Sequence, residues 1–288
     1  MSLFAGTARM ALLATLAAAL AAPASAATFR IVAGAGISGC SAPGIDATNA
    51  QPFSRQIAAR CDAGWEGSGS ATAGFGSVGV QARAATRFNG QLMVVETQAE
   101  FQDTVIFTST DPNAVSTSAR MNLDLHGLFS NSGFTGGTIE GGGVFVNRSF
   151  GFGFGQGGSQ LTFNGLELVN GPLHAAAGQT DAVLRTDMAS IPLNVPVPIS
   201  FVLRARSFSL NADNFSFVDF ANTFEIPLGS DAFELPTGIT ANSGTWLVNN
   251  RRVDPNAGAV PEPATWALMI GGFGMAGAML RRRKALAA

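Results

Sequence analysis

A period of two in side-chain polarity, broken by glycine and proline, is the feature that most constrains the fold of this chain. Residues 121–126 (Met-Asn-Leu-Asp-Leu-His) alternate strictly between apolar and polar side chains. In residues 197–210, apolar side chains such as Phe201 occupy one face and Arg204 the opposite one. Such alternation is typical of β-strands with one buried face. The chain is therefore expected to be built from strands.

Other segments have the same β-forming composition, and one of them carries the turn signal Asn164-Gly165 of a hairpin. They are residues 91–96, 100–109, 160–169, 182–188, 214–226 and 245–249. Only residues 51–60 show a weak helical pattern. The series predicts an all-β fold, a single β-sandwich of jelly-roll type over residues 27–259. A β-helix is the alternative, but no fixed-period repeat supports it.

Two glycine-rich stretches, residues 64–79 and 133–158, interrupt the alternating pattern. Glycine weakens strands and is common in flexible segments, so we expect mobile loops or irregular strands there. The alternative for the second stretch is a surface-contact loop in which exposed Phe152 and Phe154 meet a partner.

The N-terminus has the three-part pattern of a secretory signal peptide. Arg9 precedes an apolar run over residues 10–22, and the small residues Ala24 and Ala26 form a cleavage site. We expect residues 1–26 to direct the chain to the secretion translocon and to be removed. A retained N-terminal anchor helix is the alternative.

The C-terminus, residues 260–288, combines a proline motif, an apolar span and a basic cluster. Residues 264–280 are uncharged, and as a helix they reach about 25 Å, against about 30 Å for a bilayer core. They predict a minimal transmembrane helix held by the positive-inside rule; a buried core helix is the alternative. The motif and the membrane stop consist of Val260, Pro261, Glu262, Pro263, Arg281, Arg282, Arg283 and Lys284.

This tail resembles the PEP-CTERM sorting signal of Gram-negative bacteria. The run from Pro261 to Ile270, Pro-Glu-Pro-Ala-Thr-Trp-Ala-Leu-Met-Ile, is similar to the PEPxxWA subclass of alphaproteobacteria. The resemblance implies that an exosortase, a membrane-embedded protease, recognises Pro261, Glu262 and Pro263 and cleaves nearby. The chain would then be a membrane-inserted intermediate that ends at the cell surface or outside the cell.

Two cysteines, Cys40 and Cys61, lie in the exported part. An even pair in an oxidising compartment predicts a disulfide, worth about 3 kcal/mol in the chain-entropy model. Two cysteines with no histidine nearby in sequence offer too few ligands for zinc.

Motifs for catalysis, metals and cofactors are weak, and we expect none of these functions. Gly34, Gly36 and Gly39 match a G-x-G-x-x-G pattern, but the following residues cannot form the helix that a dinucleotide site needs. On the predicted strand 121–126, the side chains of Asn122, Asp124 and His126 would share one face, an arrangement that is compatible with metal ligands or an acid–base set. A solvated strand face is the alternative.

The low net charge and the C-terminal sorting signal indicate a surface protein. A formal net charge of −2 argues against nucleic-acid binding. The family association implies a non-catalytic role in adhesion or with exopolysaccharide; alternatives are a carbohydrate- or ice-binding module and an uncharacterised hydrolase. Trp65 and Glu66 form a candidate ligand platform, and the alternative is that both Trp65 and Trp246 are core residues.

Overall fold

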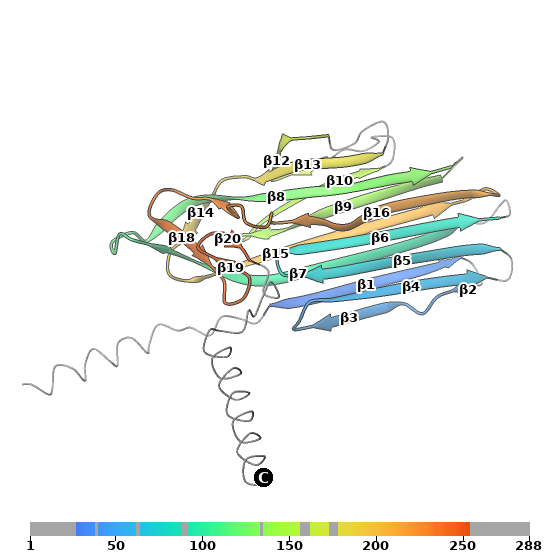
Figure 1. The fold of residues 1–288 in the computed structure, drawn as a ribbon, viewed down its shortest axis with the longest axis horizontal. Helices are drawn as coiled ribbons and strands as arrows, with labels where there is room; N and C mark the ends of the chain where they lie inside the picture. The colour runs from blue at the N-terminus through green and yellow to red at the C-terminus, as the bar shows by residue number, and fades with distance from the viewer. Residues whose placement is uncertain are drawn as a thin grey trace, which may run out of the picture. The chain divides into compact units, whose positions relative to one another are not determined.

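A computed structural model of the protein places residues 27–37, 40–61, 64–87, 92–132, 135–155, 162–172 and 178–253. Within these residues every regular secondary-structure element is a β-strand, which confirms the predicted all-β class. Figure 1 shows the long strands lying side by side with their axes nearly aligned, and neighbouring long strands are antiparallel.

The first sheet contains the N-terminal strand and the glycine-rich strands. Its order is β11 (Thr162–Asn164), β10 (Arg148–Gly155), β9 (Thr135–Phe145), β15 (Pro196–Ser209), β7 (Met93–Ser109), β1 (Thr28–Ile37) and β2 (Cys40–Ser41). In addition, β3 (Ile45–Asn49) pairs with β1, and β18 (Ile239–Asn242) pairs with β7.

The second sheet faces the first. Its order is β12 (Leu166–Asn170), β13 (Gln179–Thr186), β8 (Ser116–Asn131), β16 (Asn214–Glu225), β6 (Ser77–Thr86), β5 (Trp65–Gly74) and β4 (Phe53–Cys61). Both β14 (Ala189–Pro192) and β17 (Phe233–Glu234) pair with β8. A small ribbon is formed by β19 (Leu247–Val248) and β20 (Arg251–Arg252).

Two late strands enter the middle of the sheets. Strand β15 pairs with β7 on one side and with β9 on the other, all antiparallel. Strand β16 similarly pairs with β6 and with β8. Each sheet is therefore completed by residues far along the chain. This pairing joins the N-terminal and C-terminal halves of the folded region between residues 27 and 253, called the body below.

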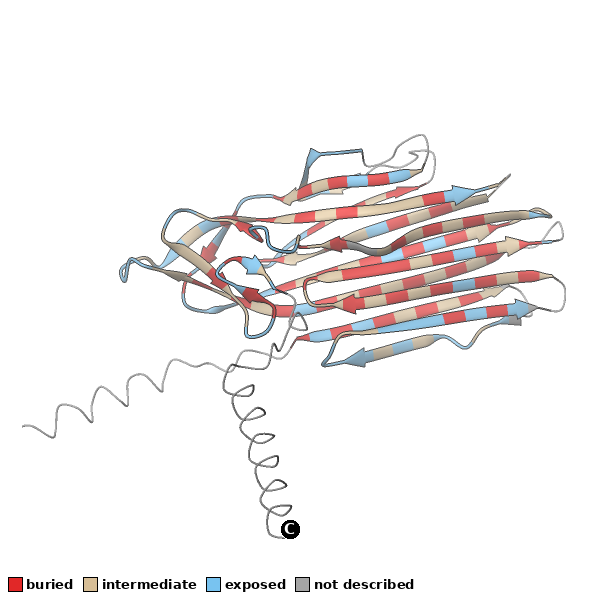
Figure 2. Ribbon diagram, viewed as in Figure 1, coloured by how far each residue is buried: buried red, intermediate tan, exposed pale blue. Residues whose placement is uncertain are grey.

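The predicted alternation produces the core. In β15, Phe201, Leu203 and Ala205 are buried. Arg204, which lies between Leu203 and Ala205 in the sequence, points outward. Figure 2 shows the same alternation of buried and more exposed residues along the long strands. Phe29, Phe101 and Phe201 lie side by side across β1, β7 and β15, with ring centroids 5.5 and 5.8 Å apart. Aromatic pairs of this kind add about 0.5–1.5 kcal/mol beyond their burial.

Glycines lie where phenylalanine rings need space. A Cβ on Gly141 would lie 2.3 Å from Cζ of Phe152, and one on Gly127 would lie 2.3 Å from Cδ1 of Phe220. The rings therefore occupy the volume that another side chain would take. Because interiors are close-packed, these glycines are packing positions and not flexible points.

Glycines also set the distance between the two sheets. A Cβ on Gly69 of β5 would lie 2.5 Å from Cγ2 of Thr97 on β7, in the opposite sheet. One on Gly67 would lie 2.8 Å from Cγ2 of Val95, also on β7. The missing side chains allow β5 to approach β7 closely.

The end of the body is anchored by buried polar contacts. Nε1 of Trp246, a fully buried residue, donates a hydrogen bond of 2.7 Å to Oδ2 of Asp103. Asp103 is only 7% exposed, and this burial raises the pKa of its carboxyl above the ordinary value. The guanidinium of Arg252 donates to Glu225 at 2.5 Å and to the carbonyl oxygen of Phe75 at 2.8 Å.

Three local expectations need correction. Residues 53–61 form strand β4, not a helical segment, and most of residues 64–79 form the regularly paired strands β5 and β6 instead of a mobile loop or irregular strand. Asn164-Gly165 does not close a hairpin, because β11 pairs with β10 and β12 with β13 in the other sheet. The positive φ of Gly165, 63°, marks the point where the chain crosses between the sheets.

Substitution of Gly69 by valine tests the close approach of the sheets. We expect Gly69→Val to lower the free energy of unfolding by about 1–3 kcal/mol, because the new side chain collides with Thr97. Urea unfolding measures the change. Gly34→Val is the matched control, since a Cβ on Gly34 meets nothing within 4 Å. Equal stability of the two variants would contradict the packing.

Substitution of Asp103 by asparagine tests the buried carboxyl. Because the folded-state pKa is raised, wild-type stability falls as pH rises from the unfolded-state pKa through the folded-state pKa. The amide introduced by Asp103→Asn does not titrate, so the stability of this variant minus that of wild type should increase over the same window and then level off. Urea unfolding at a series of pH values measures it. A difference that is constant with pH would show that Asp103 is not desolvated.

Candidate functional site

The outward side chains of the first sheet form rows that follow the strand register. Arg204 on β15 lies opposite Gln98 on β7 and opposite Glu140 on β9. In the neighbouring row, Val202 lies between Glu100 and Gly142. Residues distant in sequence therefore form one surface because the strands are paired in this register.

Arg204 is the central charge of this surface. Its Nη2 lies 2.6 Å from Oε1 of Glu96, and its Nη1 lies 3.8 Å from Oε2 of Glu140. The Arg204 side chain is 44% exposed, so these ion pairs contribute little stability, typically about 0–1 kcal/mol each. They do hold the guanidinium and two carboxylates in a common arrangement on the surface.

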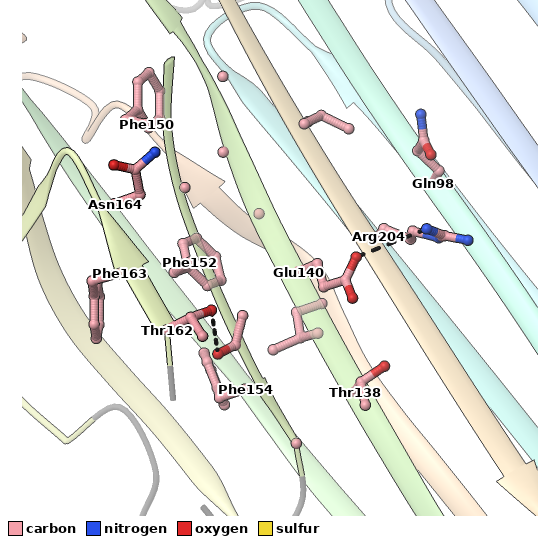
Figure 3. A pocket seen from close by; sticks show the side chains of 18 residues that line it. Gln98, Thr138, Glu140, Phe150, Phe152, Phe154, Thr162, Phe163, Asn164 and Arg204 are labelled. Atoms are coloured by element: carbon pink, nitrogen blue, oxygen red, sulfur yellow. Dashed lines mark hydrogen bonds and ion pairs between the residues drawn. The ribbon is translucent and has the colours of Figure 1, made fainter. Parts of the chain in front are cut away.

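Beside Arg204 the outer surface is hollowed, with a volume of about 580 Å³. Three of the outward positions of β9 and β10 here are glycines, Gly142, Gly151 and Gly153, so bare backbone forms the floor. Figure 3 shows Glu140 and Arg204 on one side of β10, and Thr162 and Asn164 of β11 on the other. The volume is within the usual range of ligand sites.

Several polar groups of this hollow have no partner within the described residues. The side chains of Gln98, Thr138 and Asn164 make no hydrogen bond to the part of the chain that the structure describes. Among the lining residues only Glu140 and Arg204 are charged, and their charges are opposite. The hollow therefore offers amide and hydroxyl groups to a ligand, together with a guanidinium that is shared by the carboxylates of Glu140 and Glu96.

The sequence does not predict this hollow. For residues 151–155 (Gly-Phe-Gly-Phe-Gly) it favours a mobile loop or irregular strand, with exposed rings as the alternative. They form the regular strand β10, in which Phe152 is 5% and Phe154 2% exposed. The rings belong to the core, and the glycines between them form the outer surface. The alternation of glycine and phenylalanine is itself a strand signal.

The predicted set on β8 faces outward as expected but is held by neighbouring side chains. Nδ1 of His126 lies 2.8 Å from Oδ1 of Asp181, and Asn122 accepts a hydrogen bond of 3.2 Å from Arg185. Burial raises the pKa of the Asp124 carboxyl, and the electrostatic interaction with His126 acts in the opposite direction. In the part of the chain that the structure describes, no group of three or more His, Cys, Asp or Glu side chains is close enough to hold a metal ion.

A second hollow of about 510 Å³ lies beside His126. Its polar side chains bind one another: Nε2 of Gln81 donates to Oδ1 of Asp219 at 2.9 Å, and His126 contacts Asp181. Compared with the hollow at Arg204, fewer groups here are free for a ligand.

The candidate platform at Trp65 and Glu66 is not formed as predicted. Trp65 is 8% exposed and packs in the core, so its ring is not presented to solvent. Oε1 of Glu66 lies 3.4 Å from Nη2 of Arg60 across the β4–β5 pair. The alternative for Trp65 and Trp246, that both are core residues, is confirmed. Gly34 and Gly36 lie within β1, paired with β7, and not in a phosphate-binding loop.

Several predicted residues lie outside the described residues. They are the cleavage-site residues Ala24 and Ala26, the motif from Val260 to Pro263, the span 264–280 and the basic residues from Arg281 to Lys284. The side chains of Cys40 and Cys61 are also not described. In the placed segments between residues 27 and 253, no helix is long and apolar enough to cross a bilayer.

Comparisons with known proteins identify the C-terminal segment. No curated protein and no solved structure shows significant similarity to the chain. Residues 259–284 match the family model of the PEP-CTERM protein-sorting motif. The chain therefore carries a PEP-CTERM sorting signal, which marks an exported protein that is processed by an exosortase.

Proposed function

We propose that this protein is a non-catalytic surface or matrix protein that is sorted by its C-terminal signal and associates with extracellular polysaccharide. The sorting motif at residues 259–284 is the observation that carries the proposal. The hollow of free polar groups on the first sheet supports the second part, since hydroxyl-rich ligands are bound by such groups.

Export in this proposal begins with removal of residues 1–26. The position of the first strand supports the predicted cleavage after Ala26: β1 begins at Thr28, and Ala27 is 4% exposed. The first described strand therefore begins directly after the expected cleavage point.

Processing in this proposal occurs beyond the folded body. Contacts of Arg252 with Glu225 and Phe75 anchor the end of the body, and the matched motif begins after them in sequence, at Ala259. Pro261, Glu262 and Pro263 would be recognised by the exosortase while residues 264–280 are inserted in the membrane and the basic residues stay in the cytoplasm.

A jelly-roll type of β-sandwich and a Cys40–Cys61 disulfide complete the proposed mature form. Two facing sheets with β15 and β16 inserted between earlier strands are compatible with the fold type. Strands β2 and β4, which contain the two cysteines, have Cα atoms within 8 Å of each other. A disulfide there would join the edges of the two sheets.

Replacement of Pro261, Glu262 and Pro263 by alanines in the full-length protein tests the sorting step. Without the prolines the segment loses its fixed extended backbone, and without Glu262 it loses its charge, so the exosortase should not recognise it. We expect uncleaved protein that stays in the membrane fraction, measured by intact mass and cell fractionation.

Pro255→Ala, which lies outside the matched residues, is the control and should be processed normally. Cleavage and surface display of the triple-alanine protein at wild-type level would refute recognition through these residues. Arrest of ice recrystallisation by the processed protein, without binding to any polysaccharide, would favour the ice-binding alternative.

A further inference from the structure

The hollow on the first sheet has the shape of a trough along β10. Its floor continues over Gly151 and Gly153, with β9 on one side and β11 on the other. The backbones that carry the walls are two strand spacings apart, about 9–10 Å. The wall side chains approach each other more closely, since a Cβ on Gly153 would lie 3.2 Å from Oγ1 of Thr162 and 3.6 Å from Cγ of Glu140. The trough therefore has room for one extended chain at most, lying over the floor and parallel to the strand.

The backbone of the floor cannot bind a peptide by strand addition. From Gly151 to Gly153 strand β10 is paired with both β9 and β11, so the ladder of N–H and C=O groups of the floor is occupied on both edges. The trough also lacks pockets for alternate side chains, because its floor positions carry none. These two features exclude the usual mode of binding an extended peptide to a sheet.

The chemistry of the walls matches sugar hydroxyls. Carboxylate, guanidinium, amide and hydroxyl groups come from Glu140 and Arg204 on one side and from Asn164 and Thr162 on the other. These groups donate and accept hydrogen bonds at both edges of a ring, while the flat glycine backbone can contact the apolar C–H face. The single guanidinium of Arg204 is shared by the carboxylates of Glu140 and Glu96, so this wall provides no net attraction for a polyanion.

We propose that this trough binds one extended chain of a neutral polysaccharide, lying along β10 over Gly151 and Gly153 between Glu140 and Thr162. The inference deepens the proposed association with polysaccharide, because it specifies the site and the class of ligand. Glycine at position 153 is required because any side chain there would fill the trough.

The test uses the processed protein, purified from the producing cells, in affinity electrophoresis through gels that contain soluble hydroxyethyl cellulose, galactomannan or alginate. We expect retardation by at least one of the two neutral polymers. Gly153→Val should weaken that binding at least about tenfold. The new Cβ would lie 3.2 Å from Oγ1 of Thr162, a hydroxyl that can rotate away, so the variant should fold.

Two further variants complete the design. Gly34→Val changes the same outer sheet face at an open position, far along the sheet order, and should bind as wild type does. Thr162→Val keeps the side-chain shape, removes the hydroxyl and should weaken binding severalfold. Thermal unfolding of each variant checks that it is folded.

The outcomes separate the trough from the proposed function. Wild-type binding to a neutral polymer that neither Gly153→Val nor Thr162→Val weakens would overturn the trough and leave the polysaccharide role intact. Binding to alginate alone would overturn the neutral-ligand assignment. No binding to any of the three polymers or to the exopolysaccharide of the producing cells would overturn both.

Discussion

Complementary packing of glycine and phenylalanine is the constraint on which the structure depends. Phe152 and Phe220 fill the space above Gly141 and Gly127, and Gly69 lets β5 approach Thr97 of the opposite sheet. With 35 glycines and 22 phenylalanines, the chain obtains a dense core from a few large rings and many positions without side chains. The same alternation also shapes the outer face of the first sheet, because the glycines between Phe150, Phe152 and Phe154 leave bare backbone on the solvent side.

The outer trough is therefore coupled to the core. Inward rings on β10 require a regular strand, and the regular strand places Gly151 and Gly153 in line on the opposite face. Pairing of β15 between β7 and β9 brings Arg204 beside Glu140 at the edge of this floor. A binding surface is formed here without a loop or an exposed aromatic ring. This differs from sites carried on loops above a rigid scaffold.

Side-chain periodicity makes the strands with mixed composition predictable. The alternation around Phe201 and Arg204 correctly predicts β15 and its buried face. Glycine has no side chain to show a period, so the sequence favours loops where β5, β9 and β10 form. The trough could not be predicted, because Gln98, Glu140 and Arg204 become neighbours only through the register of three strands. The sorting signal was predictable because it is a local motif, and the family match at residues 259–284 confirms it.

A crystal structure of the processed protein with a neutral oligosaccharide bound would show where the sugar lies. We expect sugar rings over Gly151 and Gly153, with hydrogen bonds to Glu140 or Arg204 on one side and to Thr162 or Asn164 on the other. Sugar bound instead at the hollow beside His126, or at a sheet edge with the trough empty, would contradict it.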